Sequence, residues 1–137
     1  MRASLENGLL ILEASGQVTA ADFEAVVHAL IAGRLDPIPR RWLVVYDPFA
    51  RLDALTLDRL RTLHRRLKAI GFPDEHDAPA RVALVARVPE HVGHARFCRS
   101  LWISETATIE AIVTGDEAEG RAWLRGDGSD HAPRYAS

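Results

Sequence analysis

The sequence predicts one α/β domain in which a small, largely parallel sheet of four strands alternates with helices. Two observations support this fold class. Four short apolar runs are spaced along the chain, and each is followed by a stretch whose apolar residues recur every three or four positions. Short turns join these segments, and such an alternation is typical of a parallel sheet with right-handed crossovers.

The first half of the chain contains two predicted strands and two predicted helices. Leu9–Leu12 is a short apolar run, and Trp42–Tyr46 lacks polar alternation, as expected of a central strand buried on both faces. Thr19 and Asp22 have the spacing of a capping box, which predicts a helix start. Helical apolar stripes then follow at Phe23, Val26, Val27, Leu30 and Ile31, and at Leu57, Leu60, Leu63, Leu67 and Ile70.

The second half repeats this pattern. Val82–Ala86 is a continuous apolar run and predicts the third strand, and His91–Ile103 predicts a helix with a partial apolar stripe. Ile109–Val113 predicts the fourth strand. The segment Thr114–Glu117 resembles a second capping box, which predicts a last helix containing Trp123 and Leu124.

Length and composition favour a single soluble domain. The chain has 137 residues, of which 47% are hydrophobic and 26% charged, close to the globular average. We expect the domain to span residues 1–125 and residues 126–137 to form a flexible tail. The net charge of −2 supplies no general field for nucleic acid. The single cysteine, Cys98, and the lack of a long apolar segment predict a cytoplasmic protein without membrane insertion.

The order and joints of these segments resemble the SpoIIAA-like branch of the STAS domains (sulphate transporter and anti-sigma-factor antagonist). Three features carry the resemblance, which covers about residues 8–125: residues 16–23 at the first helix, the strand ending 44–47, and residues 116–118 with 123–124. The resemblance implies a STAS-like fold and a regulatory or binding module.

The regulatory serine of that family has no counterpart here. Anti-sigma antagonists of the family carry an Asp-Ser-Ser-Gly run before the second major helix, and this chain has Asp53-Ala54-Leu55-Thr56 at that position. The resemblance therefore implies a module without the usual phosphoserine switch. Thr56 is a candidate binding residue, but a hydroxyl at this place is also typical of a helix cap, and we expect that role.

Asp47 and Asp53 are the obvious carboxylate pair. They lie in the loop after a predicted strand, where α/β sheets place their ligands, and they are candidates for binding or for general acid–base catalysis. The same residues are ordinary in turns, because short acceptor side chains bond neighbouring backbone amides. We favour the turn interpretation.

His91, His94 and Cys98 are spaced so that a helix places them on one face. These residue types bind zinc, but no fourth ligand is apparent, and Leu101 and Trp102 continue the same face. We therefore expect no metal and no cofactor, and we expect Cys98 to be a buried core residue.

The predicted second helix carries a local excess of positive charge. Arg61, Arg65 and Lys68 fall on one ridge, with Arg59 and Arg66 on the other side of the apolar stripe. We call Arg61, Arg65 and Lys68 the basic ridge. An acidic partner surface could bind there, although a solvated helix face explains the same residues.

These observations favour a non-enzymatic regulatory or binding module of STAS-like type that recognises a protein partner or a small apolar ligand. The alternative is a small hydrolase-like enzyme that uses Asp47 and Asp53, or His94 and Cys98, but no nucleophile–base–orienter set is apparent in the sequence. We also expect a two-fold homodimer, because a small open sheet leaves edges and three tryptophans are a large apolar load.

Overall fold

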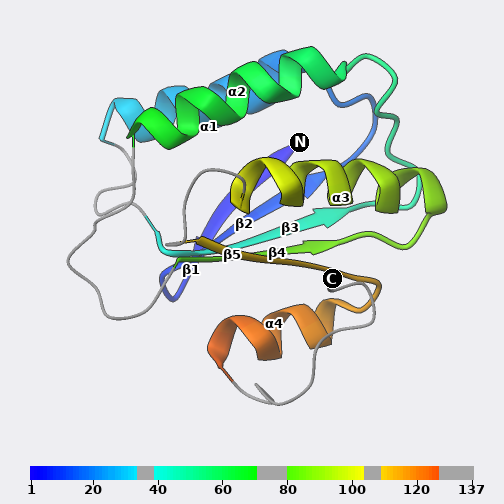
Figure 1. Cartoon of the computed structure of the whole chain (residues 1–137). Coiled ribbons are helices and arrows are strands. Elements are labelled where there is room, and N and C mark those ends of the chain that lie inside the picture. Colours follow the sequence, from blue (N-terminus) through cyan, green and yellow to red (C-terminus); the bar gives the residue numbers. More distant parts are fainter. Residues whose placement is uncertain (34–38, 71–79, 104–108, 127–137) are drawn as a thin grey trace.

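The computed structural model describes residues 1–33, 39–70, 80–103 and 109–126. Its elements follow one another as β1 (Arg2–Glu6), β2 (Leu9–Ala14), α1 (Ala20–Ile31), β3 (Arg41–Tyr46), α2 (Leu57–Ile70), β4 (Ala80–Val85), α3 (Pro89–Ile103), β5 (Ile109–Thr114) and α4 (Glu117–Arg125). Helices α1, α2 and α3 cover one face of the sheet, and α4 covers the other (Figure 1).

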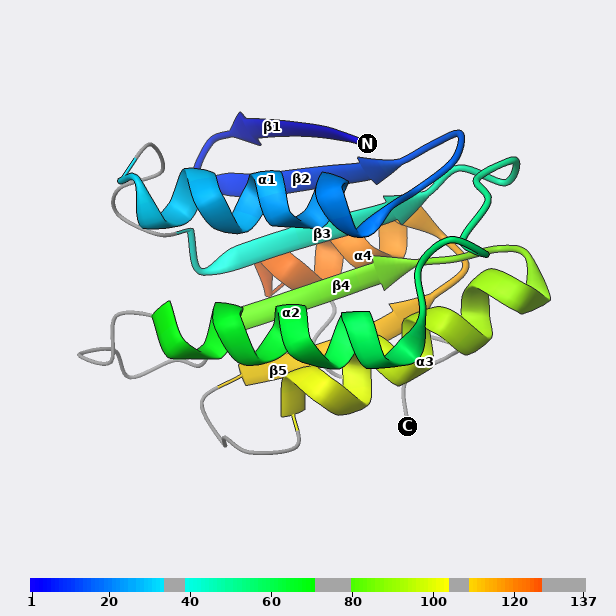
Figure 2. The ribbon, with the colours of Figure 1, turned by 90° about the horizontal axis from the view of Figure 1, so that it is seen from above.

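The five strands form one sheet in the order β1-β2-β3-β4-β5. Strands β2 to β5 are parallel, and β1 pairs antiparallel with β2. From β2 onward the chain moves across the sheet in one direction, so right-handed crossovers place all three connecting helices on the same face. The view from above shows these helices side by side over the strands (Figure 2). The α/β class is confirmed, with β3 at the centre.

The predicted count of four strands is wrong, because the sheet has a fifth strand, β1, at its edge. Every residue of β1 is exposed, so the strand has no apolar periodicity to reveal it. A hairpin turn joins it to β2 through Asn7 and Gly8, whose φ angles are +51° and +79°. An Asn-Gly pair is typical of two-residue hairpin turns, so this pair is the feature of the sequence that indicates β1.

The sheet separates two hydrophobic cores. The larger core lies between the sheet and α1, α2 and α3, and the smaller one lies under α4. Alternate residues of each strand face opposite cores, which is why the central strands have nearly continuous apolar sequences. The smaller core consists of Ile11, Leu43, Ala83, Val85, Ile112 and Leu124.

Two predicted helix starts differ in detail from the structure. At α1, the Asp22 carboxylate accepts hydrogen bonds from the backbone N–H and the hydroxyl of Thr19, at 2.8 and 3.2 Å, so the carboxylate half of the predicted capping box forms. At α4, Asp116 is the N-cap and accepts from the Ala118 N–H. Thr114 instead ends β5, and its hydroxyl donates to Glu119.

The apolar stripe of α2 begins later than predicted. Leu60 and Leu63 are buried, whereas Leu57 is 53% exposed because it lies at the first position of the helix. At the other end of the described chain, Gly126 is the C-cap of α4 and has the left-handed conformation. The remainder of the predicted tail, residues 127–137, lies outside the described residues.

Gly120, inside α4, provides a test of this packing. A Cβ at this position would lie 3.4 Å from Val85 and 3.5 Å from Ala83 and Leu43, which is ordinary van der Waals contact. Because alanine also restricts the unfolded chain, we expect Gly120→Ala to raise the free energy of unfolding by about 0.5–1 kcal/mol in urea titrations. Gly126→Ala, at φ +84°, is the control and should lower it. A loss of stability in Gly120→Ala would show that α4 packs more tightly than described.

Candidate ligand-binding site

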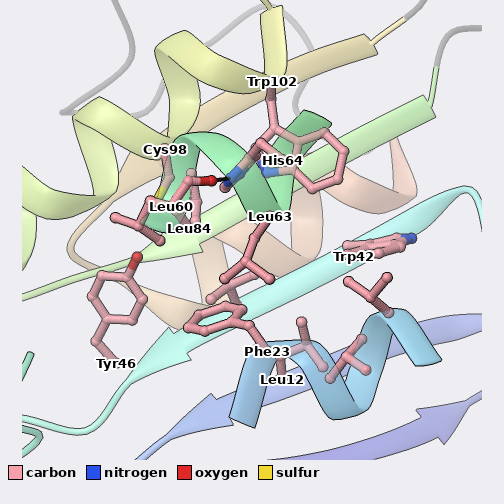
Figure 3. A pocket seen from close by; sticks show the side chains of 13 residues that line it. Leu12, Phe23, Trp42, Tyr46, Leu60, Leu63, His64, Leu84, Cys98 and Trp102 are labelled. Atoms are coloured by element: carbon pink, nitrogen blue, oxygen red, sulfur yellow. Dashed lines mark hydrogen bonds between the residues drawn. The ribbon is translucent and has the colours of Figure 1, made fainter. Parts of the chain in front are cut away.

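An apolar cavity lies between the sheet and the three helices on its larger-core face (Figure 3). The cavity volume is about 30 Å³, and the total space within its outline, which includes open solvent, is about 510 Å³. The residues that line it come from three helices and three strands: Leu12, Phe23, Val26, Val27, Trp42, Val44, Tyr46, Leu60, Leu63, His64, Leu84, Cys98 and Trp102. None of these described lining residues is Asp, Glu, Lys or Arg.

The arrangement of the helices explains why a hollow remains. Figure 1 shows α1 and α2 in a layer farther from the sheet than α3. The sheet contributes the aliphatic side chains of Leu12, Val44 and Leu84 together with the rings of Trp42 and Tyr46, and these side chains leave a space below α1 and α2. Walls that are mostly apolar, without Asp, Glu, Lys or Arg among the described lining residues, favour an uncharged, apolar occupant, because no buried charge needs a counter-ion.

One end of the cavity is aromatic. The rings of Trp42 and Trp102 meet edge to face with centroids 5.4 Å apart, and the His64 ring lies 5.1 Å from Trp102. Their polar atoms bond to backbone carbonyls: Trp42 Nε1 donates to Pro39 O at 2.7 Å, and His64 Nδ1 donates to Leu60 O at 3.0 Å (dashed in Figure 3). This end therefore presents mainly ring surface to the cavity.

The other end carries a hydroxyl and a thiol. The Tyr46 hydroxyl points toward Cys98 on α3 (Figure 3), and Tyr46 Oη lies 3.1 Å from His94 Nδ1. The Sγ atom of Cys98 is 3.9 Å from the same nitrogen. Burial raises the pKa of Tyr46 well above its ordinary value, raises the pKa of Cys98 to about 12 and lowers the pKa of His94 to about 4. All three groups are therefore uncharged at neutral pH.

The two predicted carboxylates take local turn roles. Asp47 Oδ1 accepts from the Phe49 N–H at 2.8 Å, and Asp53 Oδ1 accepts from Gln17 Nε2 at 3.2 Å. Both aspartates are exposed, and neither lines the cavity. The structure thus gives each carboxylate its own partner instead of joining the two in one site.

Thr56 and the basic ridge also lie outside the cavity. Thr56 Oγ1 accepts from the Arg59 N–H at 3.3 Å, which is the capping geometry expected at the start of α2. Arg61 pairs with Asp58 at 3.4 Å, and its guanidinium carbon lies 6.0 Å from the centre of the Phe97 ring.

The other two residues of the basic ridge are Arg65 and Lys68. Arg65 is exposed, and it has no ion pair with the described residues. The side chain of Lys68 lies outside the part of the chain whose side chains are described. A solvated helix face and a partner surface both fit these observations.

The structure does not bring His91, His94 and Cys98 together in one site, because their side chains contact two different partners. His91 Nε2 donates to Ala50 O at 2.8 Å, whereas His94 and Cys98 meet Tyr46. Among the described residues, no group of three or more His, Cys, Asp and Glu side chains is placed to hold a metal ion. The predicted burial of Cys98 is confirmed, since its side chain is in the larger core.

The residues of the cavity itself were interpreted from the sequence as ordinary core or not singled out. Trp42, Tyr46 and Trp102 looked like packing residues in a buried strand and a helix. The signal that could have pointed to the site is His64, a polar residue adjacent to Leu63 on the buried side of an otherwise basic helix. Buried polar residues of this kind are rarer than buried leucines.

Comparison with protein-family models, with curated proteins and with solved structures found no significant match. The likeness to the STAS family therefore stays a resemblance based on sequence features. Within the described residues, no helix is long and apolar enough to cross a membrane.

Proposed function

We propose that the chain is a non-enzymatic binding module, STAS-like in type, that holds a small apolar ligand in the cavity below α1, α2 and α3. The observation that carries this proposal is the cavity, which opens to solvent and has no ionised side chain among its described lining residues. Binding sites for small apolar molecules are concave and mostly apolar, with a small number of polar groups that set orientation.

The size of the cavity limits what it holds without rearrangement. The cavity volume of about 30 Å³ has room for water but is well below the roughly 150 Å³ of a cavity that holds benzene, so a ring-sized ligand requires the surrounding side chains to move. A ligand that buries about 150 Å² of apolar surface gains about 4 kcal/mol from that burial, and the loss of translational and rotational freedom offsets part of this gain. We therefore expect a dissociation constant of about 1 mM or weaker for so small a probe. A larger natural ligand would bind more tightly.

Binding can be tested by NMR with ethylbenzene as the probe. The three tryptophan indole N–H signals report on both faces of the sheet, because Trp42 and Trp102 line the cavity and Trp123 packs on the α4 side. We expect ethylbenzene to shift the signals of Trp42 and Trp102 in a saturable manner and to leave that of Trp123 unchanged. No shift up to the solubility limit of the probe would contradict the proposal.

Two neighbouring residues of β3 provide matched variants. Val44 lines the cavity, whereas Val45 faces the α4 side. We expect Val44→Phe to fill the hollow and abolish ethylbenzene binding, and Val45→Phe to keep it. Far-UV circular dichroism establishes that both variants are folded. Equal binding by wild type and Val44→Phe would mean that the probe sits elsewhere.

The absence of catalysis is part of the proposal and has two supports. A cysteine nucleophile acts as the thiolate, and burial raises the pKa of Cys98 to about 12. The Asp47 and Asp53 carboxylates have separate partners in turns. The capping contact of Thr56 likewise favours a module without a phosphorylation switch.

A protein partner and a homodimer stay predictions. Among the described strands β1 pairs only with β2, and it is exposed along its whole length, so its outer edge suits strand pairing between two copies. The tryptophan part of the dimer argument no longer holds, because Trp42 and Trp102 are only 2% and 4% exposed within one chain. In the basic ridge, Arg61 forms an exposed ion pair with Asp58, and such a surface pair contributes little free energy, so an acidic partner could replace it.

A further inference from the structure

The two ends of the cavity differ in chemistry, and this difference indicates what kind of ligand fits. At the aromatic end, Trp42 Nε1 and His64 Nδ1 already donate to backbone carbonyls. At the other end, Tyr46 lines the cavity, and its hydroxyl points toward Cys98, which is also a lining residue. A hydroxyl has one donor and two acceptor sites. The bond to His94 uses one of these sites, and the Cys98 thiol uses at most one more. The Tyr46 hydroxyl therefore has a hydrogen-bonding site left for a ligand at this end of the cavity.

Whether the Tyr46 hydroxyl donates to a ligand or accepts from it depends on which His94 nitrogen carries the proton. If Nδ1 is bare, Tyr46 donates to it, and the tyrosine oxygen can accept from a ligand. If Nδ1 is protonated, it donates to Tyr46, whose own O–H is free to donate to a ligand. An alcohol satisfies both arrangements, because its hydroxyl is donor and acceptor at once.

Ionised ligands do not suit the same place. None of the described lining residues is Lys, Arg, Asp or Glu, and Tyr46 and Cys98 are both protonated at neutral pH. A carboxylate would lose its hydration without gaining a counter-ion, and a buried charge in that position is strongly unfavourable.

We infer that the ligand is an uncharged alcohol whose hydroxyl bonds to Tyr46 and whose apolar body extends toward the Trp42–Trp102 pair. This inference rests on the proposed function, since it concerns the same cavity. Tyr46 is then the residue that orients the ligand, while the aliphatic floor and the two indole rings provide its apolar contacts.

The test compares benzyl alcohol, its apolar isostere ethylbenzene and benzoate in wild type and in Tyr46→Phe, with the indole signals as the readout. We expect Tyr46→Phe to lower the affinity for benzyl alcohol relative to that for ethylbenzene by roughly five- to tenfold, the loss of one hydrogen bond. Benzoate should bind wild type at least about 100-fold more weakly than benzyl alcohol, because its charge stays unpaired.

The orientation gives a second readout that needs no variant. In wild type, nuclear Overhauser effects should connect the methylene protons of benzyl alcohol to the Tyr46 ring and its ring protons to Trp42 and Trp102. Equal weakening of both neutral probes by Tyr46→Phe, or the reverse orientation, would overturn the alcohol inference while leaving the binding module intact. If neither neutral probe binds wild type, the proposed function itself fails.

Discussion

Replacing Leu43 with alanine is expected to lower the free energy of unfolding by about 2–5 kcal/mol, the usual range for removing a fully buried leucine. Leu43 is 0% exposed and lies at the centre of the smaller core, where it packs with residues such as Val85 and Leu124. The loss combines the transfer of buried carbon atoms and the cavity that remains, because the sheet cannot collapse into the space.

Urea unfolding followed by circular dichroism measures this loss. Leu5→Ala is the matched control, since the same truncation on the exposed edge strand β1, where Leu5 is 54% exposed, should change stability by less than about 0.5 kcal/mol. A loss below about 1 kcal/mol in Leu43→Ala would show that α4 is not firmly docked on the sheet. Because Leu43 faces away from the cavity, the folded variant should still bind ethylbenzene.

Acidification from pH 6.5 to pH 4 is expected to destabilise the protein through His94. Burial lowers the pKa of His94 from 6.5 to about 4, and its buried Nε2 has no hydrogen-bond partner among the described residues. In this interval the unfolded chain binds a proton at His94 and the folded chain does not. The free energy of unfolding therefore decreases as the pH is lowered, by up to about 1.4 kcal/mol per pH unit. The total decrease is on the order of 2 kcal/mol for this partly buried ring.

The comparison with His94→Gln isolates this contribution. Glutamine can still bond to the Tyr46 hydroxyl but does not titrate. The free energy of unfolding of the variant should therefore decline less steeply between pH 6.5 and pH 4, the interval set by the two pKa values of His94. Parallel stability curves for the two proteins would mean that His94 titrates normally in the folded state.

The sequence by itself determined the secondary structure of most of the chain. The strands at Trp42–Tyr46 and Val82–Ala86 and the start of the first helix at Thr19 were predictable, because apolar runs, helical spacing and capping residues are local patterns. Strand β1 was not predictable in this way. It is held by its pairing with β2, and an exposed edge strand needs no apolar pattern in its own sequence.

Tertiary structure alone decided where the candidate site lies. Phe23, Trp42, Leu60 and Cys98 belong to four different elements, and each follows the same apolar pattern as a residue in a filled core. Whether such residues close on one another or leave a hollow depends on how far α1 and α2 stand from the sheet, which is set by the packing of whole helices. The chemistry of the polar end was equally hidden, since Tyr46 and His94 are 48 residues apart in the chain. Hydrophobicity specifies that a side chain is removed from water, but only the assembled layers determine whether the space beside it is filled.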